Sequence, residues 1–411
     1  MDSHSKVEKM KLNNCELTEK SCSVLATVLS SKTILKEMNL NNSRLLDSGV
    51  KEICEGLKNP VCELKILNLS DCSITEEGYK ALASALRSNP SHLIELDLTG
   101  NDPGQSGVKQ LNDLLQDPNC KLKTLRFLGP AADEVCQYVK GIVGKNPLLL
   151  RELNLSEHEL GDTRMNQISA LLQDKHCKLN TLILRRCSMT EKQCFILTSA
   201  LKSNPSHLRE LDLSGNKREN KGVKHVSETL KDERCKLERL RLRYCYMTDE
   251  GCSAVTSALK SNPSHLRELN LSGNELGDSG FEKLSDLLMN PQCRLEKLHL
   301  CECSITEKQC LILTSALCLN SSHLRELDLS GNKIKNTGVN HLCDVLKDSD
   351  CKLERLSLYD CGITDVSSLT QSLSETKALQ FLKELDLRYN MIGDSKKQLS
   401  DVLRDSNCKL R

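Results

Sequence analysis

The stretch LRELNLSGN, residues 266–274, decides the fold, because its pattern returns along the whole chain. Leu269 and Leu271 are two residues apart, so both face the same side of a β-strand, while Glu268 faces the opposite side. Downstream, residues 281–288 carry apolar side chains at the i, i+3, i+7 spacing of one helix face. One unit of the pattern is therefore a strand followed by a helix packed against it.

The pattern Leu-x-x-Leu-x-Leu divides the chain into fourteen repeats, each 28 or 29 residues from the next. The repeats start near residues 7, 35, 64, 93, 122, 150, 179, 208, 237, 266, 295, 324, 353 and 382. Units of this length are stable only against their neighbours and stack into a solenoid. We therefore predict a single α/β solenoid domain over residues 1–411. Its expected shape is a right-handed horseshoe with a parallel sheet on the concave face and helices on the convex face.

Two repeat types alternate and differ in the residue at the turn after the strand. One type has Asn there, and its side-chain amide can satisfy buried loop carbonyls and amides. The other has Cys, a small side chain with a weak donor. The expected turn ladder consists of Asn101, Asn216, Asn274, Asn332, Asn390, Cys187, Cys245, Cys303 and Cys361.

This alternation resembles the ribonuclease-inhibitor class of leucine-rich repeats, which also forms the C-terminal arm of cytosolic NACHT receptors, the NOD-like receptors. The resemblance implies a protein-binding scaffold with ligand sensing, autoinhibition and a part in innate immunity. Two alternatives remain open: an enzyme inhibitor like ribonuclease inhibitor, and a GTPase-activating or actin-regulating adaptor. The NACHT module has no counterpart in this sequence. We therefore consider that the chain is a fragment of a larger NACHT-containing protein, or that it associates with itself through the solenoid ends.

Composition places further bounds on function. Lys and Arg number 57 against 56 Asp and Glu, so there is no global field to attract nucleic acid or an anionic membrane. No apolar run is long enough for a membrane span. The 22 cysteines fall mostly at fixed repeat positions, which favours buried, reduced thiols and a cytoplasmic protein.

The strand residues opposite the helices are the expected partner-binding surface. Asn-type strands carry acidic pairs such as Glu210 with Asp212, and later Cys-type strands carry basic residues, so we expect a self-compensated face with pairs such as Asp212 with Arg241. Because the Cys-type strands differ from one another, they are the better candidates for recognising a specific protein. The candidate residues are Arg239, Arg241, Arg243, Tyr244, His299, Arg355 and Tyr359.

No motif indicates catalysis. Gly141-Ile-Val-Gly144-Lys145-Asn146 lacks the spacing and the hydroxyl of a nucleotide-binding loop. Cys301 and Cys303 lie across a strand end, which is a weak metal pattern. We predict a non-enzymatic protein without cofactor, metal or nucleic acid. The repeat over residues 122–149 has Pro130 at its turn, so a local irregularity is expected there.

Overall fold

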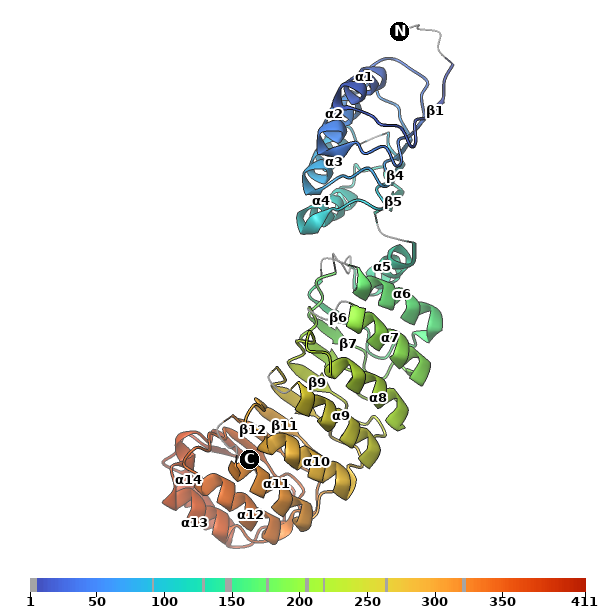
Figure 1. Cartoon of the computed structure of the whole chain (residues 1–411). Coiled ribbons are helices and arrows are strands. Elements are labelled where there is room, and N and C mark those ends of the chain that lie inside the picture. Colours follow the sequence, from blue (N-terminus) through green and yellow to red (C-terminus); the bar gives the residue numbers. More distant parts are fainter. Residues whose placement is uncertain are drawn as a thin grey trace. The chain divides into compact units, whose positions relative to one another are not determined.

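The structure is a computed structural model that describes residues 6–90, 92–127, 130–144, 150–174, 177–203, 207–216, 219–262, 265–319 and 323–411. The chain divides into two compact units, and each is a stack of strand–helix repeats. One contains residues 1–150 with 174–178, and the other contains residues 151–173 with 179–411. In each unit the described helices line one face of a parallel sheet (Figure 1).

The first unit has a five-stranded sheet whose strands lie in chain order. Its strands are β1 (Lys9–Lys11), β2 (Glu37–Asn39), β3 (Ile66–Asn68), β4 (Glu95–Asp97) and β5 (Thr124–Arg126). Its helices are α1 (Glu19–Leu29), α2 (Leu46–Lys58), α3 (Glu76–Ser88), α4 (Gly104–Gln116) and α5 (Pro130–Val143).

The second unit has a ten-stranded sheet, again in chain order. Its strands are β6 (Glu152–Asn154), β7 (Thr181–Ile183), β8 (Glu210–Asp212), β9 (Arg239–Arg241), β10 (Glu268–Asn270), β11 (Lys297–His299), β12 (Glu326–Asp328), β13 (Arg355–Ser357), β14 (Glu384–Asp386) and β15 (Lys409–Leu410). Its helical elements are α6 (Gly161–Gln173), α7 (Glu191–Ser203), α8 (Glu219–Leu230), α9 (Asp249–Ser261), α10 (Gly277–Met289), α11 (Glu307–Leu319), α12 (Lys335–Lys347), α13 (Ser367–Glu375), η2 (Ala378–Gln380) and α14 (Ser395–Leu403).

The strand register places equivalent leucines side by side. Leu269 of β10 lies opposite Leu240 of β9 and Leu298 of β11, and all three side chains are fully buried. Phe281 and Leu284 of α10 are buried as well. A single strand and a single helix cannot bury these leucines alone, so each repeat uses its neighbours as the rest of its core. The predicted class, an α/β solenoid of leucine-rich repeats, is confirmed.

Helix starts are fixed by side chains of the same repeat and of the one before. In α7 the backbone N–H of Thr190 donates to Gln193 Oε1 at 3.0 Å, and the N–H of Gln193 donates to Thr190 Oγ1 at 3.3 Å. These two bonds form a reciprocal capping box. In addition, Gln193 Nε2 donates to Asp162 Oδ1 of α6 at 3.0 Å, which links consecutive helices.

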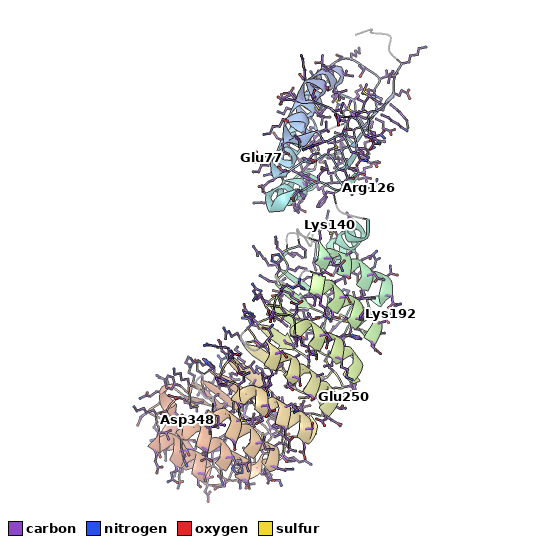
Figure 2. All side chains as sticks on the ribbon, in the orientation of Figure 1. Glu77, Arg126, Lys140, Lys192, Glu250 and Asp348 are labelled. Carbon is purple, nitrogen blue, oxygen red and sulfur yellow. The ribbon has the colours of Figure 1, made fainter. Side chains whose placement is uncertain are left out.

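Charged residues at the first helical turns add ion pairs on the outer side of the helices. Glu77, Lys192 and Glu250 are examples from α3, α7 and α9 (Figure 2). Lys192 Nζ lies 2.6 Å from Asp162 Oδ2, and Glu250 Oε1 lies 2.5 Å from Lys224 Nζ. These side chains are largely exposed, so each pair stabilises the fold by at most about 1 kcal/mol.

The repeat over residues 122–149 is where the first sheet ends in the sequence. β5 is the last strand of the five-stranded sheet and β6 the first of the ten-stranded one. Pro130 is the first residue of α5, where a missing N–H costs nothing because that N–H has no partner in a helix. Residues 128–129 and 145–149 of this repeat lie outside the described residues.

Candidate partner-binding surface of the ten-stranded sheet

The turns after the strands are held by a ladder of buried asparagines. Asn274 Oδ1 accepts hydrogen bonds from the backbone N–H groups of Cys245 and Met247, at 3.1 and 3.0 Å. Its Nδ2 donates to the carbonyls of Leu242 and Leu271, at 2.8 and 2.7 Å. One side chain therefore joins two consecutive repeats. The same four bonds are made by Asn101, Asn216, Asn332 and Asn390.

The turn cysteines complete the ladder in the intervening repeats. Cys303 Sγ donates to the carbonyl of Leu271 at 3.4 Å, and burial raises the pKa of its thiol to about 12. Cys187, Cys245 and Cys361 make the equivalent contact with the repeat before. The 22 cysteines all lie in the described residues as thiols outside disulfide bonds, and most are buried. The Cys303 thiol is thus held in the neutral, donating form.

The acidic column of the Asn-type strands has a local structural role that the sequence analysis missed. Asp212 Oδ1 accepts a hydrogen bond from the backbone N–H of Ser214 at 3.0 Å. The same hydrogen bond, from the backbone N–H two residues later, is accepted by Asp97, Asn154, Asn270, Asp328 and Asp386. Asp and Asn favour such turns because their short side chains reach the backbone two residues on. Their recurrence at the strand end was the signal that could have revealed this role.

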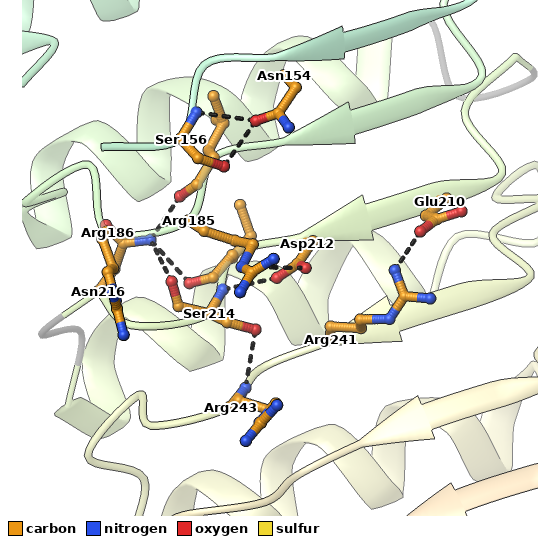
Figure 3. A network of polar contacts seen from close by, with 12 residues as sticks. Asn154, Ser156, Arg185, Arg186, Glu210, Asp212, Ser214, Asn216, Arg241 and Arg243 are labelled. Atoms are coloured by element: carbon orange, nitrogen blue, oxygen red, sulfur yellow. Dashed lines mark hydrogen bonds and ion pairs between the residues drawn. The ribbon is translucent and has the colours of Figure 1, made fainter. Parts of the chain in front are cut away.

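Charges on the open face of the sheet, the face without helices, compensate one another as expected, but with different partners. Arg241 contacts Glu210 (Figure 3). It also contacts Glu268, with its Nη2 2.8 Å from Glu268 Oε1. Arg239 contacts the same two carboxylates, at 3.2 and 3.8 Å. The expected pair of Asp212 with Arg241 is wrong. Although their Cα atoms are in register, the short Asp212 side chain is engaged by its own turn and lies 3.9 Å from Arg185 Nε instead.

In the later strands, charges on the open face of the sheet are paired in the same way around Glu326. Its carboxylate lies 3.6 Å from Lys297 Nζ, 3.8 Å from His299 Nε2 and 3.3 Å from Arg355 Nη1. Burial of Asp328 opposes its ionisation, but hydrogen bonds from His299 and Ser330 outweigh this effect and hold the pKa of Asp328 below its ordinary value. Arg239, Arg241, His299 and Arg355 of the candidate set are therefore already engaged with carboxylates of neighbouring strands.

Arg243, Tyr244 and Tyr359 of the candidate set lie beyond the strands, in the loops that lead to the helices. Tyr244 Oη donates to Glu302 Oε2 at 2.8 Å, and the Arg243 guanidinium lies 5.4 Å from the centre of the Tyr244 ring. The ring of Tyr359 lies 4.7 Å from that of Tyr389. The structure thus separates the candidate residues into a paired strand face and a group of strand-end loops.

Two exposed residues of these loops were not predicted as candidates. Tyr389 is 76% exposed and Met391 is 88% exposed. Tyr389 has a φ of 60° and stands where four other Asn-type repeats, at Gly100, Gly215, Gly273 and Gly331, have glycine. A tyrosine at a glycine position of a regular repeat was the signal that could have identified it. We call Tyr359, Arg388, Tyr389 and Met391 the aromatic patch.

The described ranges contain neither a metal centre nor a membrane span. Within them, no group of three His, Cys, Asp or Glu side chains is arranged to hold a metal ion. Of the helices whose residues are described, none is both long enough and apolar enough to cross a membrane.

The sequence matches known proteins over most of its length. The family model described as Leucine Rich repeat matches residues 62–83, 204–225, 234–255, 262–285, 320–343 and 378–395. Ribonuclease inhibitor of Sus scrofa is 38% identical over 377 residues, which are 90% of this chain and 81% of that protein. NACHT, LRR and PYD domains-containing protein 14 of Mus musculus is 34% identical over 390 residues, which are 94% of this chain and 38% of that protein. The crystal structure of the yeast Rad7 and Elc1 complex covers 96% of this chain and 83% of that one, with 16% identity and a TM-score of 0.40.

Proposed function

This chain belongs to the ribonuclease-inhibitor type of leucine-rich-repeat proteins, and we propose that it binds its protein partner with the aromatic patch and the neighbouring strand-end loops. Members of this family are protein-binding scaffolds and not enzymes. The strand face carries charges that are already paired, so it offers few free anchors of its own. The strand-end loops, in contrast, expose side chains that are available to contact a partner.

The observation that carries the proposal is the exposure of large side chains in the aromatic patch. Tyr389 and Met391 together present apolar surface that the described part of the chain leaves uncovered. The ring of Tyr359 contacts that of Tyr389 at an interplanar angle of 47°, and the Arg388 guanidinium lies 5.7 Å from the Tyr359 ring centre. Arg388 is itself held by Asp386, with its Nη2 2.6 Å from Oδ2. Ordered Tyr and Arg side chains lose little entropy on binding and commonly dominate interface energies.

We place this binding in the setting of a NOD-like receptor: the chain is proposed to be the ligand-sensing and autoinhibitory repeat region of such a protein, acting in innate immunity. Support comes from the match of 94% of this chain to a NACHT, LRR and PYD protein, of which it spans 38%. The proposed location is the cytoplasm, because so many buried cysteine thiols outside disulfide bonds suit a reducing compartment.

Inhibition of a ribonuclease is the second candidate. It is favoured by one observation, that the chain covers 81% of the ribonuclease inhibitor of Sus scrofa. The net charge of +1 is against it, because the basic ribonucleases that such an inhibitor blocks favour a strongly acidic partner.

One experiment addresses both candidates. The chain is titrated into a pancreatic-type ribonuclease with a fluorogenic RNA substrate, and separately into a purified NACHT module from a homologous receptor, with binding followed by interferometry. The receptor proposal predicts binding to the NACHT module without inhibition of the ribonuclease; the inhibitor candidate predicts the reverse.

The double variant Tyr359→Ala/Tyr389→Ala should weaken whichever interaction is found by about tenfold or more. Phe195→Ala is the matched control, because Phe195 is an aromatic residue of α7 that is 56% exposed on the helix side. Equal loss in the control and the double variant, or no loss in either, would contradict binding through the aromatic patch.

A further inference from the structure

Three arginines around Ser214 are less closely paired with carboxylates than the arginines of β9 are. Arg185 and Arg186 follow β7, and Arg243 follows β9, so the loop after β8 lies between them (Figure 3). The backbone N–H of Arg186 donates to the Ser214 carbonyl at 2.9 Å, and that of Arg243 donates to Ser214 Oγ at 3.2 Å. The backbones that carry the three guanidinium groups are therefore fixed relative to one another.

Arg243 differs from the arginines of β9, which face Glu210 and Glu268. Its Nε is buried and has no hydrogen-bond partner among the described residues. The carboxylate of Glu302 accepts a hydrogen bond from the neighbouring Tyr244 hydroxyl at 2.8 Å. A buried guanidinium nitrogen without an acceptor is unfavourable, and an incoming anion that draws the side chain outward would relieve this.

Arg185 and Arg186 are only loosely compensated. Arg185 Nε lies 3.9 Å from Asp212 Oδ2, and Arg186 Nη1 lies 3.5 Å from Glu157 Oε1. The Arg186 side chain is 73% exposed and that of Glu157 is 71% exposed, so this pair is readily exchanged for another partner.

The arrangement favours several separate carboxylates over one compact anion. The Asp212 carboxylate lies 3.9 Å from Arg185 Nε and would repel a doubly charged group placed beside it. Arg185 and Arg243 belong to strands two apart, so their Cα atoms are separated by about 10 Å. Alternate residues of an extended peptide are about 7 Å apart, so carboxylates on such a peptide can reach the outer arginines and avoid Asp212.

We propose that Arg185, Arg186 and Arg243 form a docking site for an acidic segment of a protein partner, rich in Glu or Asp and bound in extended form across the loops after β7, β8 and β9. This site rests on the proposed function as a protein-binding scaffold and adds the charge of the partner to it. It is separate from the aromatic patch, so each can be tested without the other.

The test uses the full chain and a short fluorescein-labelled peptide in which Glu alternates with Ser, followed by fluorescence polarisation. A peptide with Gln in place of Glu is the neutral probe. We expect the Glu peptide to bind about tenfold more tightly than the Gln peptide, and the difference to vanish on raising the salt from about 0.05 M to about 0.5 M.

Arg186→Gln and Arg243→Gln should each remove most of this preference, and Arg243→Lys should retain part of it. Arg404→Gln is the matched control, because Arg404 is 72% exposed and paired with Asp401 on α14. Equal binding of the two peptides overturns the site, as does loss of preference in the control. Tighter binding of a phosphoserine peptide alone, or of single-stranded RNA, also overturns it. None of these outcomes touches Tyr359 or Tyr389, so the aromatic patch is judged by its own variants.

Discussion

At the scale of the residue, the Asn-type and Cys-type repeats both use the turn residue after the strand to bind the repeat before. Asn274 uses its amide to join its own repeat to the one before, and Cys303 donates its thiol to the Leu271 carbonyl. Each polar group is buried and satisfied, so each is expensive to remove. The turn asparagines and cysteines were readable from the sequence because they recur at a fixed position. The bond of Asp212 to its own turn was not, since a strand-face carboxylate is equally suited to pairing with an arginine across the sheet.

Asn274→Ala should lower the free energy of unfolding by about 3 kcal/mol, because four backbone groups lose their partner in a buried turn. Asn390→Ala removes the same four bonds at a half-buried turn, where water can replace them, and should cost about half as much. Urea denaturation followed by circular dichroism measures both. Equal losses of unfolding free energy in the two variants would show that burial of the turn asparagine is not what makes its hydrogen bonds stabilising.

Stability should fall at alkaline pH because of the turn thiols. The pKa of Cys303 is about 12 in the fold, while an unfolded thiol ionises near about 8.5, so the unfolded state releases its proton first as pH rises. The stabilisation by the Cys303 thiol is complete at pH values below the pKa of the unfolded state. It is lost as the pH rises toward the pKa of the folded state. Between about pH 8 and about pH 10 it amounts to about 1–2 kcal/mol for this thiol.

The measurement is the difference in unfolding free energy between the wild type and Cys303→Ala at these two pH values. The wild type should lose more stability than the variant. Parallel behaviour of the two proteins would mean that the thiol is not protected from ionisation by the fold.

Tyr389 should be a residue that costs stability and serves binding. Its φ of 60° suits glycine, which occupies this place in four other repeats, and a bulky residue there is strained by about 1 kcal/mol or more. Tyr389→Gly should therefore unfold at a temperature no lower than the wild type and bind the partner at least about tenfold more weakly. Calorimetry and interferometry on the same preparation give both values. A large loss of thermal stability would instead assign Tyr389 a structural role.

At the scale of the element, each strand and helix is completed by its neighbours. Strand register puts Glu210 and Glu268 on either side of Arg239, and Arg241 reaches diagonally to both. The period of the leucines predicted the strands and helices, because burial on one face imposes it. The ion-pair partners on the open face of the sheet were not predictable from strand register alone. A long Arg side chain reaches carboxylates diagonally across neighbouring strands, and a short Asp side chain does not.

Arg241→Met should lower the free energy of unfolding by about 2 kcal/mol, because it leaves the largely buried carboxylates of Glu210 and Glu268 with Arg239 as their remaining cation. Adding Glu268→Gln should restore part of this loss, which a double-mutant cycle detects. Arg186→Met is the matched control: its partner Glu157 is exposed, so the change should be within about 0.5 kcal/mol. A loss of unfolding free energy as small for Arg241→Met as for Arg186→Met would show that the ion pairs of Arg241 do not stabilise the fold.

At the scale of the whole molecule, the repeats form two compact units with separate parallel sheets, and Pro130 begins the helix that follows the last strand of the first sheet. That residues 1–411 act as one domain stays a prediction. The family and the fold class followed from the repeated pattern and are confirmed by the relatives and the sheets. Binding residues were harder to predict, since the exposure of Tyr389 and the isolation of Arg243 depend on side chains from other repeats.

We have proposed that the strand-end loops of the ten-stranded sheet bind a protein. Its most direct test places a photo-crosslinking amino acid at Tyr389, and in a second chain at Phe195 on the helix side, and compares the products after irradiation of cultured vertebrate cells. We predict a discrete adduct with one protein from position 389, reproduced with that protein in purified form, and no such adduct from position 195. Adducts of equal yield from both positions, or from position 195 alone, would contradict the claim.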